Sequence, residues 1–192
     1  MPILGTVASQ FSGKSFGSFE SIATATGTGS SNTITFNSIP STYKHLQIRM
    51  ITKTSDSGSA SATATMYFNN LNTGTGYAWH AMEADGANVT PWRGSGLSSF
   101  FVGGNSTSWI PYSGFTNNVG AGIIDIYDYA STSKAKTVKI IVGSVVSTTN
   151  GVIKVGSGLS TTTSAISSIS FVNGATAWGT ATSIALYGIK GE

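Results

Sequence analysis

The sequence predicts an all-β protein, and three observations lead to this class. Threonine, valine, isoleucine and aromatic residues are plentiful, while runs rich in leucine, glutamate and lysine are scarce, which favours strands over helices. With 40% apolar residues, the chain can bury a core and is not expected to be disordered. Short alternating segments separated by turn residues recur along the chain, as in sandwiches and barrels. We therefore expect an antiparallel β-sandwich, jelly-roll-like, with an extended N-terminal arm.

The 192 residues suit a single domain, which we place at residues 19–192. Residues 1–18 are small and rich in glycine and serine, and they carry bulky apolar side chains without a clear period. These are Ile3, Leu4, Val7, Phe11 and Phe16. Because such side chains are unfavourable in water, we expect an attachment arm that packs on a neighbouring subunit or another protein. A disordered terminus is the alternative.

Strands are expected in the following order. In the first half, alternation predicts strands at 19–26, 32–39, 43–54, 62–70, 77–83 and 97–103. In the second half, strands are expected at 121–130, 136–147, 151–156, 165–174 and 182–191. The asparagine-rich segment 69–76 is expected to form a turn at the end of the strand at 62–70. Asn150-Gly151 and Asn173-Gly174 each suit a type I′ turn, so both are expected to close hairpins.

The composition excludes several functions. Only 9% of residues are charged, and the net charge of +3 is spread in isolated pairs, so no basic surface for nucleic acid is expected. The chain has no cysteine, which excludes disulfides and thiolate metal sites. It has no apolar run long enough for a signal peptide or a membrane-spanning helix, so we expect a soluble protein without membrane insertion.

The stretch "SIPSTYKHLQIRM" at 38–50 concentrates basic residues. In a two-residue period Leu46, Ile48 and Met50 fall on one side, and His45, Gln47 and Arg49 on the other. This pattern indicates a half-buried strand with a polar outer face. We expect that face to take part in hydrogen bonds and ion pairs at the rim of a protein interface. Its residues are Lys44, His45, Gln47 and Arg49.

Other polar residues are weak candidates for a metal site or a catalytic site. His80 with Glu83 and Asp85 could in principle bind a metal or transfer protons, but ligands and a nucleophile are missing. Asp125 and Asp128 invite a calcium site, but in a strand they would point to opposite faces. We therefore predict no catalytic residues, no metal site and no cofactor.

Several aromatic residues lie in turn-like, glycine-rich surroundings. Sugar rings stack on such side chains, so Trp92, Trp109 and Tyr112 are candidates for glycan contact. Filling of the core or of a subunit interface is the alternative use of these rings.

Three pieces of the chain carry a resemblance: "ITFNSIPSTYKHLQIRM" at 34–50, "GIIDIYDYASTSKAKTVKI" at 122–140 and "ATSIALYGIKG" at 181–191. Together with the opening "MPILGTVASQFSGK", they resemble small virion structural proteins of tailed bacteriophages, of the tail-fibre, tail-component or head-decoration type. The resemblance implies a non-enzymatic β-sandwich on the particle exterior, made in the host cytoplasm and assembled with other virion proteins. It also implies a homo-oligomer, commonly a trimer. A carbohydrate-binding module that recognises a host surface glycan at a fibre tip is the alternative function, and a polysaccharide depolymerase is a third.

Overall fold

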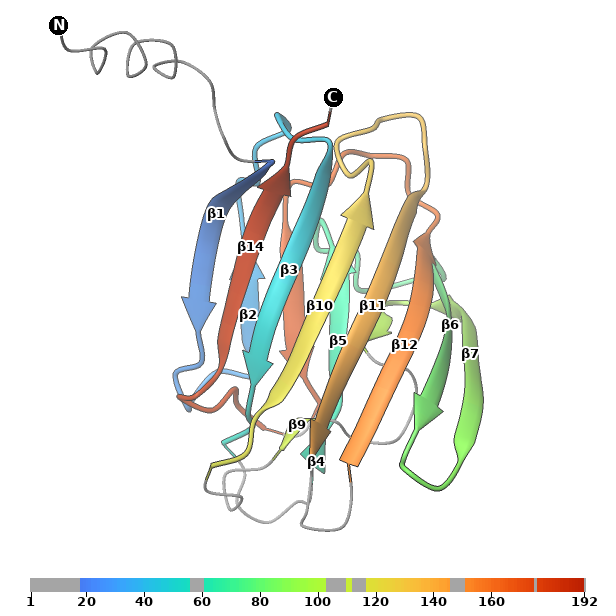
Figure 1. Cartoon of the computed structure of the whole chain (residues 1–192). Helices are drawn as coiled ribbons and strands as arrows, with labels where there is room; N and C mark the ends of the chain where they lie inside the picture. Colours follow the sequence, from blue (N-terminus) through green and yellow to red (C-terminus); the bar gives the residue numbers. More distant parts are fainter. Residues whose placement is uncertain are drawn as a thin grey trace, which may run out of the picture.

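The computed structural model describes residues 18–55, 61–102, 110–111, 117–145, 151–174 and 176–191. These residues form strands, turns and loops, and none of them is helical. Figure 1 labels the strands, whose bounds are β1 (Phe19–Thr26), β2 (Thr33–Phe36), β3 (His45–Thr52), β4 (Ser61–Ala62), β5 (Ala64–Phe68), β6 (Tyr77–Ala84), β7 (Val89–Leu97), β8 (Phe100–Val102), β9 (Ile110–Pro111), β10 (Gly120–Tyr127), β11 (Lys136–Val145), β12 (Gly151–Ser160), β13 (Ile169–Asn173) and β14 (Ser183–Ile189).

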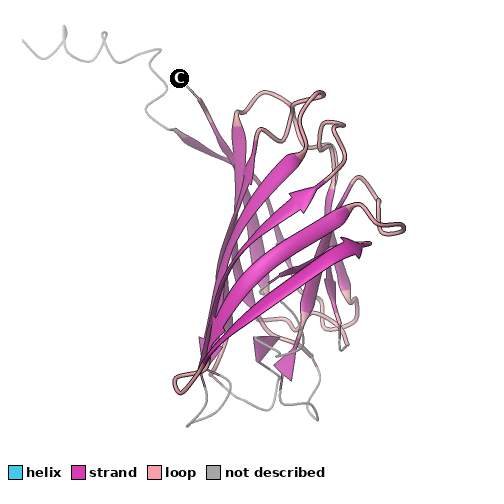
Figure 2. Ribbon diagram, turned by 90° about the vertical axis from the view of Figure 1, so that its right-hand side faces the viewer, coloured by secondary structure: helices cyan, strands magenta, loops and turns pink. Residues whose placement is uncertain are grey.

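The strands form two main antiparallel sheets, which confirms the all-β sandwich. The large sheet has the order β1-β14-β3-β10-β11-β12-β6-β7, and the small sheet has the order β2-β13-β5-β8. A third pair, β4 with β9, is short. Figure 2 shows the two sheets as two layers. The jelly-roll connectivity stays a prediction, and the arm lies outside the described residues.

The core lies between the two layers. Strand β3 supplies Leu46, Ile48 and Met50, which are 0%, 0% and 3% exposed, so the alternation predicted for this strand is confirmed. From the small sheet, Phe68 and Phe171 are fully buried against them. Alternate side chains of each strand face this core because successive residues of a strand point to opposite sides of the sheet.

Two turn predictions have different outcomes. Strands β11 and β12 pair as antiparallel neighbours, so the hairpin expected around Asn150-Gly151 is confirmed. The type I′ turn expected there is wrong, because Gly151 already pairs with Val145 in the ladder and does not have the positive φ that this turn requires. The hairpin predicted at Asn173-Gly174 is wrong, because β13 belongs to the small sheet and β14 to the large one. Asn173 is buried, and its Nδ2 donates to the carbonyl of Ala177, so this segment carries the chain from one layer to the other.

The turn after β5 follows its predicted chemistry. Asn69 and Asn70 both have positive φ, which asparagine tolerates better than most residues. The Asn69 Oδ1 accepts hydrogen bonds from the backbone N–H groups of Ser167 and Ser168, and its Nδ2 donates to the carbonyl of Ala165. The turn is therefore tied to the segment that precedes β13.

Candidate functional site

The outer face of the large sheet, turned away from the core, is the candidate functional site. Figure 1 looks onto this face. The strand register arranges its side chains in rows that cross the sheet from β14 to β7. One row, here called the polar row, consists of Tyr187, Gln47, Asp125, Lys139, Ser157, His80 and Arg93.

On one side of the polar row, the first and second rows are mostly apolar. Their bulky members, here called the apolar band, are Ile51, Met82, Val89, Ile123, Ile141, Ile153 and Val155. Their exposure runs from 38% for Ile141 to 70% for Val89, so none is buried within the chain. A shallow hollow of about 500 Å³ lies over the band on strands β3, β10, β11 and β12. The band is thus a broad apolar surface in contact with solvent.

At the β14 side of the face, polar and aromatic side chains contact one another. The Gln47 Nε2 donates to Asp125 Oδ1 at 2.8 Å, and the Arg49 Nε donates to Gln47 Oε1 at 2.9 Å. The Arg49 guanidinium also lies over the rings of Phe19 and Tyr187, at 5.7 and 5.5 Å from their centroids. These contacts hold Arg49 over the face by hydrogen bonding and cation–π attraction.

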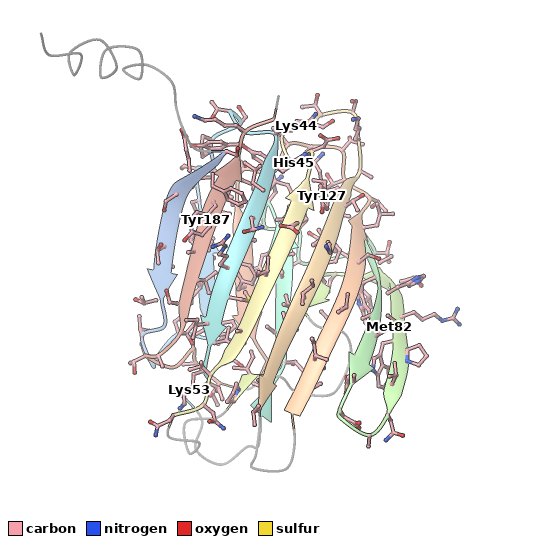
Figure 3. All side chains as sticks on the ribbon, in the orientation of Figure 1. Lys44, His45, Lys53, Met82, Tyr127 and Tyr187 are labelled. Atoms are coloured by element: carbon pink, nitrogen blue, oxygen red, sulfur yellow. The ribbon has the colours of Figure 1, made fainter. Side chains whose placement is uncertain are left out.

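His45 stands at the end of β3, beside the loop that follows β10. Its Nδ1 accepts a hydrogen bond from the backbone N–H of Asp128 at 3.0 Å, so Nδ1 carries no proton. Its ring meets that of Tyr127 edge to face at 5.3 Å. Figure 3 shows Lys44, His45 and Tyr127 together at this end of the sheet. The role of this histidine in the single chain is to hold the loop.

The loop between β10 and β11 is fixed by two lysines that pair with one carboxylate. Asp128 has a positive φ and bonds Lys44 at 2.8 Å and Lys134 at 2.9 Å. Hydrogen bonds from these two lysines lower the pKa of Asp128 to about 2. The loop is therefore stabilised by charge as well as by backbone geometry.

Lys136 lies directly below this loop and is fully buried. Its Nζ donates to the carbonyls of Ser131, Lys134 and Thr163 at 2.6, 2.6 and 3.0 Å. Burial lowers the pKa of Lys136, and the neighbouring charge of Asp128 opposes that shift. The ammonium group uses its three donors on three carbonyls, so it acts as a structural cation rather than a reactive amine.

The four residues predicted as a polar face lie together. His45, Gln47 and Arg49 are on the outer side of β3, whereas Lys44 precedes the strand. All four make the contacts described above with groups of their own chain. Their participation in an interface between proteins stays a prediction.

The candidate glycan residues are only partly placed. Trp92 was expected in a turn-like segment, but it lies within β7. There it is half-buried and packs against the core. Its indole N–H is buried and has no acceptor among the described residues. Trp109 and Tyr112 lie outside the described residues, as do Ile3, Leu4, Val7, Phe11 and Phe16 of the arm.

The group of His80, Glu83 and Asp85 is separated by the sheet. His80 is exposed in the polar row, whereas Glu83 points inward and bonds the buried Lys154 at 3.1 Å. Asp85 accepts hydrogen bonds from the backbone of the following turn. Within the described ranges, no three His, Cys, Asp or Glu side chains gather as a metal site would require.

Sequence reasoning missed the apolar band, the buried Lys154–Glu83 pair and the buried Lys136. One signal for the band was available, because β11 and β12 contain bulky apolar residues at both parities, as in "KIIV" and "GVIKV". An antiparallel strand with one solvent-facing side ordinarily alternates apolar with polar residues. Apolar residues at both parities therefore predict a second covered face.

No protein-family model, curated protein or solved structure matched this chain. In the part of the chain that the structure describes, no helix has the length and apolar character needed to cross a membrane.

Proposed function

We propose that this protein is a non-enzymatic structural component on the exterior of a tailed-bacteriophage particle, as a tail or fibre component or a capsid decoration. In this proposal it attaches to other virion proteins through its N-terminal arm and forms a homo-oligomer through the sandwich. It is made in the host cytoplasm and resides in the virion. It needs no cofactor, nucleic acid or membrane for this role.

One observation carries the proposal: the three pieces on which the resemblance rests, far apart in the sequence, form a single unit in the fold. They supply β3, β10 with the start of β11, and β14, and these strands are neighbours. The Tyr129 hydroxyl of the second piece donates to the carbonyl of Pro40 in the first. Gly188 of the third lies under the Tyr43 ring, where a Cβ would be 2.3 Å from the nearest ring atom. A resemblance in three interlocked pieces supports a shared fold more strongly than three isolated matches.

The exposed apolar band also supports a role in assembly. Monomeric soluble proteins rarely expose large contiguous apolar patches, and such patches usually mark contacts with other proteins or membranes. A particle component is expected to bury such a surface when it assembles.

The direct test is to purify the phage particles and locate the protein by mass spectrometry and by immunogold electron microscopy. We expect a fixed copy number per particle and labelling of the exterior. Its absence from purified particles would overturn the proposal.

The arm is tested by deleting residues 1–18. We expect the shortened chain to keep the thermal unfolding profile of the sandwich and to be absent from particles. The matched control pair is Phe11→Ser, which removes an apolar side chain of the arm, and Gln10→Ser, which does not. Normal incorporation of the truncated chain would show that attachment occurs elsewhere.

A second candidate function is recognition of a host glycan, and one feature favours it. A hollow of about 700 Å³ lies on β6, β7 and β12, lined in part by His80, Pro91, Arg93 and Ser157. This combination of apolar surface with a few polar groups is common in small-ligand sites. Binding of the isolated protein to a glycan array, lost in Arg93→Ala and retained in Lys139→Ala, would favour this function.

A further inference from the structure

We propose that the outer face of the large sheet docks on the same face of a second copy of this chain, so that two large sheets stack in a two-fold pair. The inference rests on the homo-oligomer in the proposed function and names the surface and symmetry of the contact. Its two-fold symmetry departs from the trimer that the resemblance implies. It does not depend on where in the particle the protein resides.

The chemistry of the face resembles that of a protein interface, with an apolar centre and a polar margin along one side. The apolar band runs over six adjacent strands, from β3 to β7, and Arg49 is the one charged residue in its two rows. The polar row borders the band along one side. Protein interfaces have this arrangement, with an apolar centre that is poor in charge except for arginine and a polar rim.

The size of the face matches what a stable pair requires. Eight strands about 4.8 Å apart and about eight residues long give a face of roughly 900 Å². A standard interface buries about 800 Å² on each partner. The face can therefore supply a complete interface without contributions from other parts of the chain.

The distribution of exposed apolar side chains points to the same face as the partner surface. Among the described residues, the large apolar side chains that are exposed lie on this face, except for Leu71 and Val119 in loops. No second apolar surface of comparable extent is present in the described part of the chain to receive the band. Because this face is the one extensive apolar surface in the described part of the chain, we expect it to pair with the same face of a second copy. Such a contact between identical surfaces is isologous.

The charges of the polar row suit pairing between identical surfaces. The row holds Asp125 together with Lys139 and Arg93, so both signs are present along it. A partner with strong charge of one sign would meet repulsion from part of the row. An identical copy presents both signs in return.

The test uses the purified full-length chain, followed by analytical ultracentrifugation over a range of concentrations. We expect an even number of copies, and Ile141→Asp or Ile153→Asp is expected to raise the dissociation constant at least tenfold. Leu71→Asp is the matched control, because Leu71 is 44% exposed but lies in the turn after β5. Circular dichroism and thermal unfolding confirm that each variant folds.

The absence of cysteine in the chain allows a second measurement that does not depend on weakening the contact. Single cysteines are introduced at Ile123, Ile141 and Val155, in the row of the band that adjoins the polar row, and at Leu71 as the control. We expect a disulfide-linked pair from at least one band position under mild oxidation and none from the control.

Several results would overturn the inference. A monomer at all concentrations would do so, as would an oligomer whose stability the band variants leave unchanged, including a trimer. If removing residues 1–18 converts a monomer into an oligomer, the arm covers the band in place of a second copy. Finding the protein outside phage particles while the pair forms would overturn the proposed function alone, so the two failures are distinguishable.

Discussion

Lys136→Met provides a sharp test of how the loop between β10 and β11 is held. The substitution keeps an unbranched side chain of similar length in a fully buried position but removes the ammonium group. Three carbonyls, those of Ser131, Lys134 and Thr163, then lose their donor at once. The second sequence piece that carries the resemblance contains both the lysine and two of its acceptors.

The magnitude follows from the number of acceptors and their surroundings. A carbonyl left without a partner in a buried position costs about 1–3 kcal/mol. The acceptor residues Lys134 and Thr163 are exposed, so water can reach part of this site after the change, and the lower end of the range applies. Three such losses give a decrease of roughly 3 kcal/mol in the free energy of unfolding. For a chain of this size, that decrease lowers Tm by about 6–12 °C.

The assay is urea unfolding followed by tryptophan fluorescence, with thermal unfolding as a second probe. Lys139→Met is the matched control, because Lys139 lies on the same strand three residues later and is exposed on the outer face. At protein concentrations where the proposed pair is dissociated, we expect the control to change the unfolding free energy by less than about 0.5 kcal/mol, as is usual for a surface substitution. Equal effects of the two substitutions would refute the structural role of the buried ammonium.

Two further predictions concern the same sheet. Because the folded pKa of Asp128 is about 2 and below its ordinary 3.8, its carboxylate adds stability above about pH 4 that is lost as the pH falls toward 2; the Tm difference between wild type and Asp128→Asn should shrink over this window, and a constant difference would contradict the assigned ion pairs. A Cβ on Gly158 would lie 2.4 Å from the Phe100 ring, so Gly158→Ala should cost roughly 1–3 kcal/mol in urea unfolding. Gly151→Ala on the same strand, whose Cβ would meet nothing closer than 3.5 Å, should stay within about 1 kcal/mol of wild type, and equal losses would argue against the close approach.

Alternation along single strands could be predicted from the sequence because it depends on local geometry alone. The period of two places Leu46, Ile48 and Met50 in the core, as expected. Strand β7 was missed because Pro91, Gly94 and Gly96 within it are turn formers. β7 is an edge strand, where proline is tolerated.

Cross-strand packing explains one of these glycines and also why it could not be predicted. Gly94 lies opposite Trp79 of β6, and a Cβ there would come 2.7 Å from the indole nitrogen of that tryptophan. The glycine provides room for a ring that lies 15 residues earlier in the chain. Only the pairing of β6 with β7 reveals this requirement, and the pairing is a property of the whole fold.

The candidate site was predictable only in part, because alternation along one strand can be recognised in the sequence and the placement of strands beside one another cannot. The outer polar face of β3 follows from one strand, whereas the apolar band is formed by five other strands as well. Its members are ordinary strand residues when each segment is taken alone. Apolar residues at both parities of β11 and β12 indicate a second covered face, but the extent of the band follows only from the strand order, which places Ile123, Ile141 and Val155 in one row.

The resemblance and the proposed docking surface involve different kinds of constraint. At the end of the sheet where the three sequence pieces meet, each position admits few residue types: Asp128 has a positive φ, Gly188 lies under a ring, and Lys136 satisfies three carbonyls. The apolar band requires only side chains of suitable size and hydrophobicity, and many combinations meet that need. Proteins with this fold are therefore expected to share the first set of residues and to differ in the second. It follows that the resemblance bears on the fold of the chain, while the identity of its partner has to be established on the outer face itself.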